Sequence, residues 1–82
     1  MLQNISMEFD TELFGERLKK LRIKKGITTV RLGQEIGVSD ATVSRWENGL
    51  IRPTADSIVK LVKFFKIPAG YLMGTEDYHN LV

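Results

Sequence analysis

Apolar residues recur at helical spacing along most of the chain, in short groups separated by glycine and proline. Phe14, Leu18 and Leu21 mark one face of a helix predicted over residues 11–25. Val and Ile follow the same spacing and do not alternate as they would in strands. The later groups at this spacing are Leu32 and Ile36, Val43 and Trp46, and Ile58 with Leu61, Val62 and Phe65, and a short fifth helix carries Tyr71 and Leu72. The pattern predicts an all-α, compact five-helix fold.

Cap residues and glycines predict where each helix begins and ends. Ser, Thr and Asp cap helix starts, and glycine ends helices because it tolerates positive φ. We expect a first helix from Thr11 to Gly26, a second from Thr28 to Gly37, a third from Ser39 through Asn48 to Gly49, a fourth from Thr54 to the break at Ile67-Pro68, and a fifth ending at Gly74. The predicted core comprises Phe14, Leu18, Leu21, Leu32, Ile36, Val38, Val43, Trp46, Ile58, Leu61, Val62, Phe65, Ile67 and Leu72.

The length of 82 residues fits one domain. We divide the chain into a loose N-terminal leader over 1–10, a helical domain over 11–74 and a C-terminal tail over 75–82. There is no cysteine, and no apolar run approaches the roughly 20 residues that cross a bilayer. Because residues 1–6 also lack a basic start and a long apolar stretch, we expect no signal peptide, no membrane partner and a cytoplasmic location.

Charge is distributed unevenly along the chain. The net charge is only +2, yet all twelve Lys and Arg lie within residues 17–66, together with just four acidic residues. The first sixteen residues carry four acids and no base. A basic middle between acidic ends is compatible with a nucleic-acid surface and equally with an ordinary mixed surface.

Residues 29–48 carry the most informative pattern. Only Gly37-Val38-Ser39 separates the second helix from the third, and so short a link forces the two helices to cross steeply. Gly37 supplies the positive φ of the turn, and Gly33 supplies a small residue where the helices approach. Val43 and Trp46 then face inward, which leaves the opposite side of the third helix exposed.

At these residues the sequence resembles the helix-turn-helix of phage repressor and Cro-type proteins, also called the xenobiotic-response-element family. The resemblance covers Phe14 to Gly74. It is carried by the Gly37-Val38-Ser39 turn, by the run Val43-Ser44-Arg45-Trp46-Glu47-Asn48-Gly49, by Pro53 before the next helix, and by Tyr71-Leu72-Met73-Gly74. It implies a lambda-repressor-like DNA-binding domain whose third helix enters the major groove.

The resemblance also implies residue roles on the third helix. Ala41, Ser44 and Arg45 occupy base-reading positions; Arg45 suits the O6 and N7 acceptors of guanine, and Ala41 suits a thymine methyl. Asp40 occupies such a position too. Its carboxylate is repelled by phosphates, so it either accepts from cytosine N4 or serves as a charge at the helix N-terminus, and we prefer the second interpretation.

The implied phosphate contacts come from several elements. Thr29 holds a position where the family often has Gln, so a shorter reach is expected there. The candidates are Thr29, Ser39, Thr42, Asn48, Arg52 and Arg22. Arg22 and Glu47 match a pair that forms a partly buried salt bridge in family members. This bridge either turns Arg22 toward phosphate or only joins two helices, and both can hold.

Leu50 and Ile51 are unexpected, because this connector is usually polar or basic in the family. Either one of them tucks under the fourth helix, or both join Phe64 and Tyr71, together with Tyr78 and Leu81, in a dimer surface. We expect a homodimer on a palindromic operator, with recognition helices about 34 Å apart.

Other chemistry has little support in the sequence. No phosphate loop, paired carboxylates or nucleophile–base set is present, so we expect no enzyme, no cofactor and no metal; His79 is a lone histidine. Trp46 fits the core better than base stacking.

The predicted function is a sequence-specific transcriptional regulator of prokaryotic or phage type, acting on double-stranded DNA as a repressor in the nucleoid. The alternatives are an antitoxin or other interaction module that binds a protein through its tail, and a non-specific nucleoid binder.

Overall fold

Residues 7–77 are described, in a computed structural model, and they form five helices and no strand. The helices are α1 (Thr11–Lys25), α2 (Thr29–Ile36), α3 (Asp40–Glu47), α4 (Ala55–Phe65) and α5 (Ala69–Met73). The predicted all-α, five-helix fold is confirmed. Within this described part, no helix is both long enough and apolar enough to span a membrane.

The predicted helix starts at Thr28, Ser39 and Thr54 are confirmed, because each side chain accepts a hydrogen bond from a backbone N–H of its own first turn. The predicted cap of α1 is wrong. Asp10, not Thr11, caps this helix, since its Oδ1 accepts from the Leu13 N–H at 3.0 Å. The sequence offers two adjacent cap-forming residues, and the helix uses the first of them.

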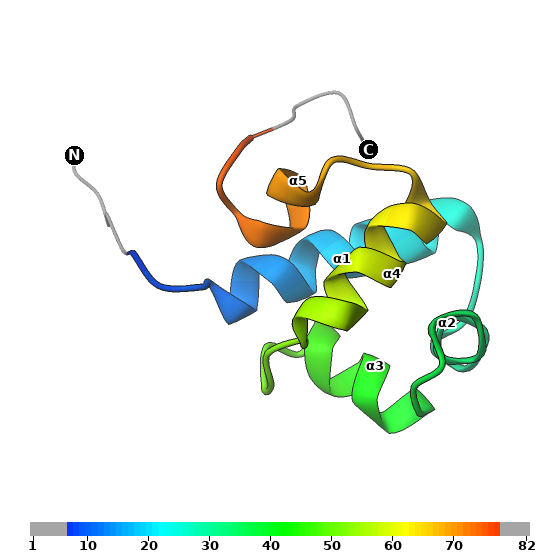
Figure 1. Cartoon of the computed structure of the whole chain (residues 1–82). Coiled ribbons are helices and arrows are strands. Elements are labelled where there is room, and N and C mark those ends of the chain that lie inside the picture. Colours follow the sequence, from blue (N-terminus) through cyan, green and yellow to red (C-terminus); the bar gives the residue numbers. More distant parts are fainter. Residues whose placement is uncertain (1–6, 78–82) are drawn as a thin grey trace.

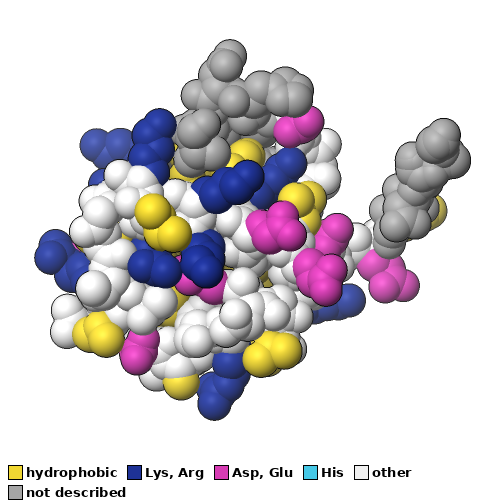
Figure 2. Space-filling model, turned by 180° about the vertical axis from the view of Figure 1, so that it is seen from behind, with side chains coloured by type: hydrophobic (Ala, Val, Ile, Leu, Met, Phe, Trp, Pro, Cys, Tyr) yellow, Lys and Arg dark blue, Asp and Glu magenta, His cyan; other side chains and the backbone are white. Residues whose placement is uncertain are grey.

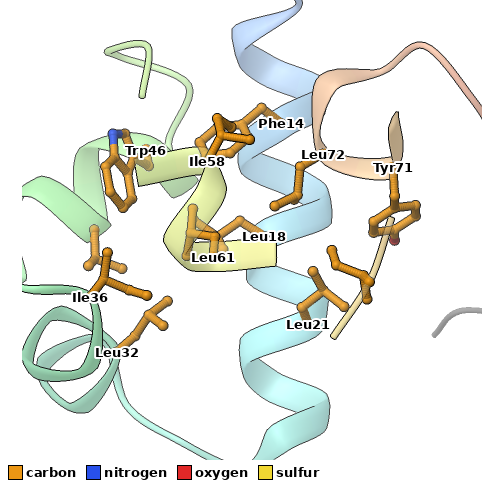
Figure 3. Packing of buried hydrophobic residues seen from close by; sticks show 12 residues of the cluster. Phe14, Leu18, Leu21, Leu32, Ile36, Trp46, Ile58, Leu61, Tyr71 and Leu72 are labelled. Atoms are coloured by element: carbon orange, nitrogen blue, oxygen red, sulfur yellow. The ribbon is translucent and has the colours of Figure 1, made fainter. Parts of the chain in front are cut away.

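α1 runs through the middle of the molecule, with α5 on one side and the α2–α3 pair on the other (Figure 1), and α4 packs against α2 and α5. Side chains from all five helices meet in one core (Figure 3). The buried apolar residues are Phe14, Leu18, Leu21, Leu32, Ile36, Val43, Trp46, Ile58, Leu61, Ile67, Tyr71 and Leu72. Eleven of these were predicted from the sequence.

Four residues lie differently from the prediction. Val38, Val62 and Phe65 were expected in the core but are only partly buried at its edge. Tyr71 was expected at a dimer surface, yet only 4% of it is exposed. Its ring packs under the guanidinium of Arg17, whose carbon lies 4.6 Å from the ring centroid, and burial raises the pKa of the Tyr71 phenol.

Both ends of the described chain contact the helices. The Phe9 ring lies 5.6 Å from the Phe14 ring, so the end of the predicted leader packs on the core. At the other end, Nη1 of Arg17 donates to the backbone oxygens of Tyr71 (2.7 Å) and Glu76 (3.0 Å), and Nη2 pairs with Asp77. Residues 1–6 and 78–82, including Tyr78, His79 and Leu81 of the predicted tail, lie outside the described residues.

Candidate nucleic-acid interface

The turn between α2 and α3 has the geometry that the sequence predicts. Gly37 adopts φ 84°, and the N–H groups of Gly37 and Val38 both donate to the Gly33 carbonyl, at 2.8 and 2.9 Å. A Cβ on Gly33 would lie 2.6 Å from the Val38 carbonyl oxygen. In Figure 1, α2 is seen end-on while α3 lies across the view, so the two helices cross steeply.

α3 is fixed to the rest of the domain by two side chains and one close backbone contact. Val43 and Trp46 are buried, and the Trp46 ring meets the Phe14 ring edge-on at 6.1 Å. Trp46 is therefore a core residue, as predicted. Gly15 of α1 allows the approach, because a Cβ there would clash with the Trp46 carbonyl and lie 2.9 Å from that of Glu47. Gly15 was not predicted as a contact residue from the sequence, where the one sign of it is a glycine inside a helical pattern.

The opposite side of α3 is exposed. With Val43 and Trp46 turned inward, the structure brings five of the predicted site residues together on one outward surface: Asp40, Ala41, Ser44, Arg45 and Asn48. The Asn48 side chain donates weakly to the Ser44 hydroxyl, at 3.4 Å. Arg45 is the one cation in this group, so the surface pairs a bidentate donor with small and polar neighbours.

Two of the predicted phosphate-contacting residues lie at the start of α3. The Ser39 hydroxyl accepts from the Thr42 N–H at 3.0 Å and lies 2.9 Å from the Thr42 hydroxyl. This cap orders the first turn of α3, while Asp40 and Ala41 are left with N–H groups that no carbonyl of the helix accepts. Such a helix start favours an anion.

Thr29 and Asp40 contact each other. The Thr29 hydroxyl, at the first residue of α2, donates to Oδ1 of Asp40, at the first residue of α3, over 2.5 Å. Eleven positions separate the two residues in the chain, so this contact was not predicted from the sequence. Only the steep crossing of the helices brings them together.

Arg22 and Glu47 form the predicted salt bridge. Nε of Arg22 donates to Oε2 of Glu47 at 2.6 Å, and Nη2 donates to Oε1 at 3.0 Å. Nη1 also donates to the Ile27 carbonyl at 2.9 Å. Hydrogen bonding to Glu47 raises the pKa of the Arg22 guanidinium above its ordinary value. The bridge joins α1 to the end of α3 and fixes the loop before α2.

The connector after α3 is exposed. Leu50 is 70% exposed and Ile51 37%, so neither residue is tucked under α4, which was one of the two expectations. Arg52 is exposed beside them. Phe64 lies elsewhere, half-buried, with the Lys25 ammonium 5.0 Å from its ring centroid. The structure therefore does not gather Leu50, Ile51, Phe64 and Tyr71 into one patch.

Basic side chains are spread over the surface. On the face shown in Figure 2, Lys and Arg occur at many points, whereas several Asp and Glu gather at one side. Arg17 and Arg22 of α1 do not face solvent, since their side chains are only 14% and 15% exposed. Both act within the domain.

Comparison with known proteins decides the family. The sequence profile of the helix-turn-helix family matches residues 18–72. The chain belongs to this family. Within it, the resemblance to Cro/C1-type proteins noted from the sequence is confirmed.

Several relatives of this helix-turn-helix chain are regulators. It is 41% identical over 68 residues to the HTH-type transcriptional repressor RghR of Bacillus subtilis (strain 168), covering 82% of this chain and 50% of RghR. It is 33% identical over 64 residues to repressor protein C2 of Salmonella phage P22, covering 78% of this chain and 30% of C2. The chain thus spans half the length of these relatives or less.

One solved structure is similar in both fold and sequence. The crystal structure of the P22 c2 repressor protein in complex with a synthetic operator matches with a TM-score of 0.74 and 32% identity. The match covers 80% of this chain and all of that one. The lambda-repressor-like architecture expected from the sequence is therefore confirmed.

Proposed function

We propose that this protein binds double-stranded DNA through α3 and acts as a transcriptional repressor by occupying an operator. The observation that carries this proposal is the exposed surface of α3, held rigid from behind by Val43, Trp46 and the Arg22–Glu47 bridge. A reading helix must present its side chains on a fixed frame, because a small displacement weakens hydrogen bonds to base edges. The operator-bound P22 c2 relative supports the same role.

On that surface, Arg45 is proposed to donate to O6 and N7 of a guanine. Ala41 lies one turn earlier on the same side and suits a thymine methyl, while Ser44 can donate to or accept from a neighbouring base. These three exposed side chains lie on one helix of eight residues, so they read adjacent positions of one half-site.

The phosphate contacts are proposed to flank α3. Ser39, Thr42 and Asn48 lie at its two ends, and Arg52 follows in the exposed connector. The Thr29 hydroxyl proton is committed to Asp40, so any phosphate contact there falls to the backbone N–H of Thr29. Arg22 is hydrogen-bonded to Glu47 and to the Ile27 carbonyl, and a contact from its remaining N–H groups to phosphate stays a prediction.

A homodimer on two half-sites is part of the proposal. Leu50 and Ile51 are apolar and exposed beside the DNA-facing helix, which suits a contact with a second copy near the operator dyad. Occupancy of chromosomal or phage DNA would place the protein with the nucleoid. No catalytic step or cofactor is invoked.

Retention of DNA fragments tests the proposal. The full chain is immobilised and a genomic fragment library is passed over it at moderate salt, with unrelated duplexes as competitor. A few fragments should be retained well above the competitor. Equal retention of all fragments would favour a non-specific binder, and co-purification of a small protein without any fragment would favour the interaction module.

A further inference from the structure

The hydrogen bond between Thr29 and Asp40 joins the first residues of α2 and α3 at the exposed edge of the reading surface. It is short, 2.5 Å from the Thr29 hydroxyl to Oδ1 of Asp40. The Asp40 side chain is exposed, and Thr29 is partly buried. The bond therefore anchors a solvent-facing carboxylate to a neighbouring helix.

α3 does not need this carboxylate as a cap. Ser39 already accepts the Thr42 N–H at 3.0 Å and fills the N-cap position. Within residues 7–77, the hydrogen bond of the Asp40 side chain runs to Thr29 and not to its own helix, and it uses Oδ1 alone. Oδ2 is left as an acceptor on the outward side, and the positive end of the α3 dipole favours its charge.

The charge of this group restricts what it can contact. Glu47 turns inward to Arg22, so Asp40 is the acidic member of the outward set that also contains Ala41, Ser44, Arg45 and Asn48. A carboxylate is repelled by phosphates and by the O6, O4 and N7 acceptors of the groove. Major-groove donors are the N4 amine of cytosine and the N6 amine of adenine.

Cytosine suits a carboxylate better than adenine does. The adenine amine lies beside N7, which is an acceptor. Its lone pair would repel the second oxygen of a carboxylate that accepts from the amine. The cytosine amine stands beside a C–H edge, which carries no lone pair. A carboxylate that accepts only and cannot donate therefore distinguishes the two bases.

We propose that Asp40 selects a cytosine in each half-site by accepting from its N4 amine, and that Thr29 is the positioning residue for this contact. The inference rests on the proposed DNA binding. Donation from Thr29 fixes the carboxylate rotamer before DNA arrives, which reduces the entropy lost on binding. A charge at the helix N-terminus does not by itself require the hydrogen bond from Thr29 that fixes this carboxylate.

Site selection from a random duplex pool tests the inference, with the full chain as wild type, Asp40→Ala, Asp40→Asn, Thr29→Val and Thr29→Ser. Wild type should enrich cytosine at one position of each half-site, preferred by about tenfold over the other bases. Asp40→Ala should lose that preference and keep the rest of the site. Asp40→Asn should change it to adenine, because an amide pairs with both N6 and N7.

The Thr29 variants separate positioning from folding. Thr29→Val should reduce the cytosine preference without changing the other positions, and Thr29→Ser should restore it because the hydroxyl is kept. The thermal unfolding midpoint of each variant shows that it is folded. If Asp40→Ala selects the same cytosine as wild type, the inference is wrong while DNA reading stands. If wild type enriches no sequence at all, the proposed function is wrong as well.

Discussion

Arg22 and Glu47 form a bidentate ion pair that connects α1 to the end of α3, with their side chains only 15% and 6% exposed. Glu47→Gln removes the charge that Arg22 faces and leaves a mostly buried guanidinium without its counter-ion. We expect a loss of about 3 kcal/mol in the free energy of unfolding. Urea denaturation measures this loss directly.

The matched control is Glu35→Gln. Glu35 pairs with Arg31 at 2.8 Å on the surface of α2, with side chains 35% and 58% exposed. Its loss should stay below about 1 kcal/mol. Because the pKa of Arg22 is raised above its ordinary value, Arg22 stays charged at neutral pH. The effect of Glu47→Gln on stability should therefore not change with pH near neutrality. Equal effects of the two variants would contradict a structural role for the bridge.

Gly15→Ala is expected to destabilise the domain, although alanine is the better helix former. The new Cβ would clash with the Trp46 carbonyl and lie 2.9 Å from the Glu47 carbonyl, and both are backbone atoms that cannot turn away. Overpacking of this kind costs about 1–3 kcal/mol. Thermal unfolding should show a lower midpoint, whereas Glu16→Ala, at the next and exposed position, should change it little. An unchanged midpoint in Gly15→Ala would refute the close approach of α1 and α3.

Arg45 and Arg52 should affect DNA binding differently. Arg45→Ala removes a proposed base contact and should lose about 1–3 kcal/mol of discrimination at one base pair. Arg52→Ala removes a proposed phosphate contact, so it should weaken binding to all sequences alike and lower the slope of log K against log salt by about 1. Titration of selected and scrambled duplexes at several salt concentrations measures both. If both variants showed the same pattern, the assignment of base and phosphate contacts would fail.

Leu50→Asp should weaken the proposed dimer. Leu50 is 70% exposed, so the substitution leaves the folded monomer intact, but it places a charge in the contact between two copies. We expect a loss of about 2 kcal/mol in association, seen by sedimentation and as weaker binding to a palindromic site. Ile23→Asp is the control, because Ile23 is 58% exposed on α1. Association that survives Leu50→Asp would remove the connector from the dimer surface.

Much of the fold could be predicted because its signals are local. Thr28, Ser39 and Thr54 cap their helices by accepting a hydrogen bond from the backbone N–H three residues later. Gly37 ends α2 because glycine readily adopts a positive φ. The spacing of Val43 and Trp46 is enough to say which side of α3 faces inward. This in turn predicted which residues are exposed on it.

What the sequence did not predict depends on contacts between distant residues. Tyr71 was expected at the surface, but it is buried beneath Arg17, which lies 54 positions away in the chain. The bond from Thr29 to Asp40 exists only because two helices cross at a particular angle. Gly15 cannot be distinguished from an unfavourable helix residue before the backbone of α3 is placed against it.

Amide chemical shifts of the full chain, recorded while a selected duplex is added, test the central claim most directly. The account predicts the largest changes at the outward residues of α3, with smaller ones at Ser39, Thr42 and Arg52 and little change along α1 and α5. Arg45→Ala should reduce the changes for the selected duplex. Changes centred on α1 or α5 instead, or spread evenly over the surface, would contradict a reading role for α3.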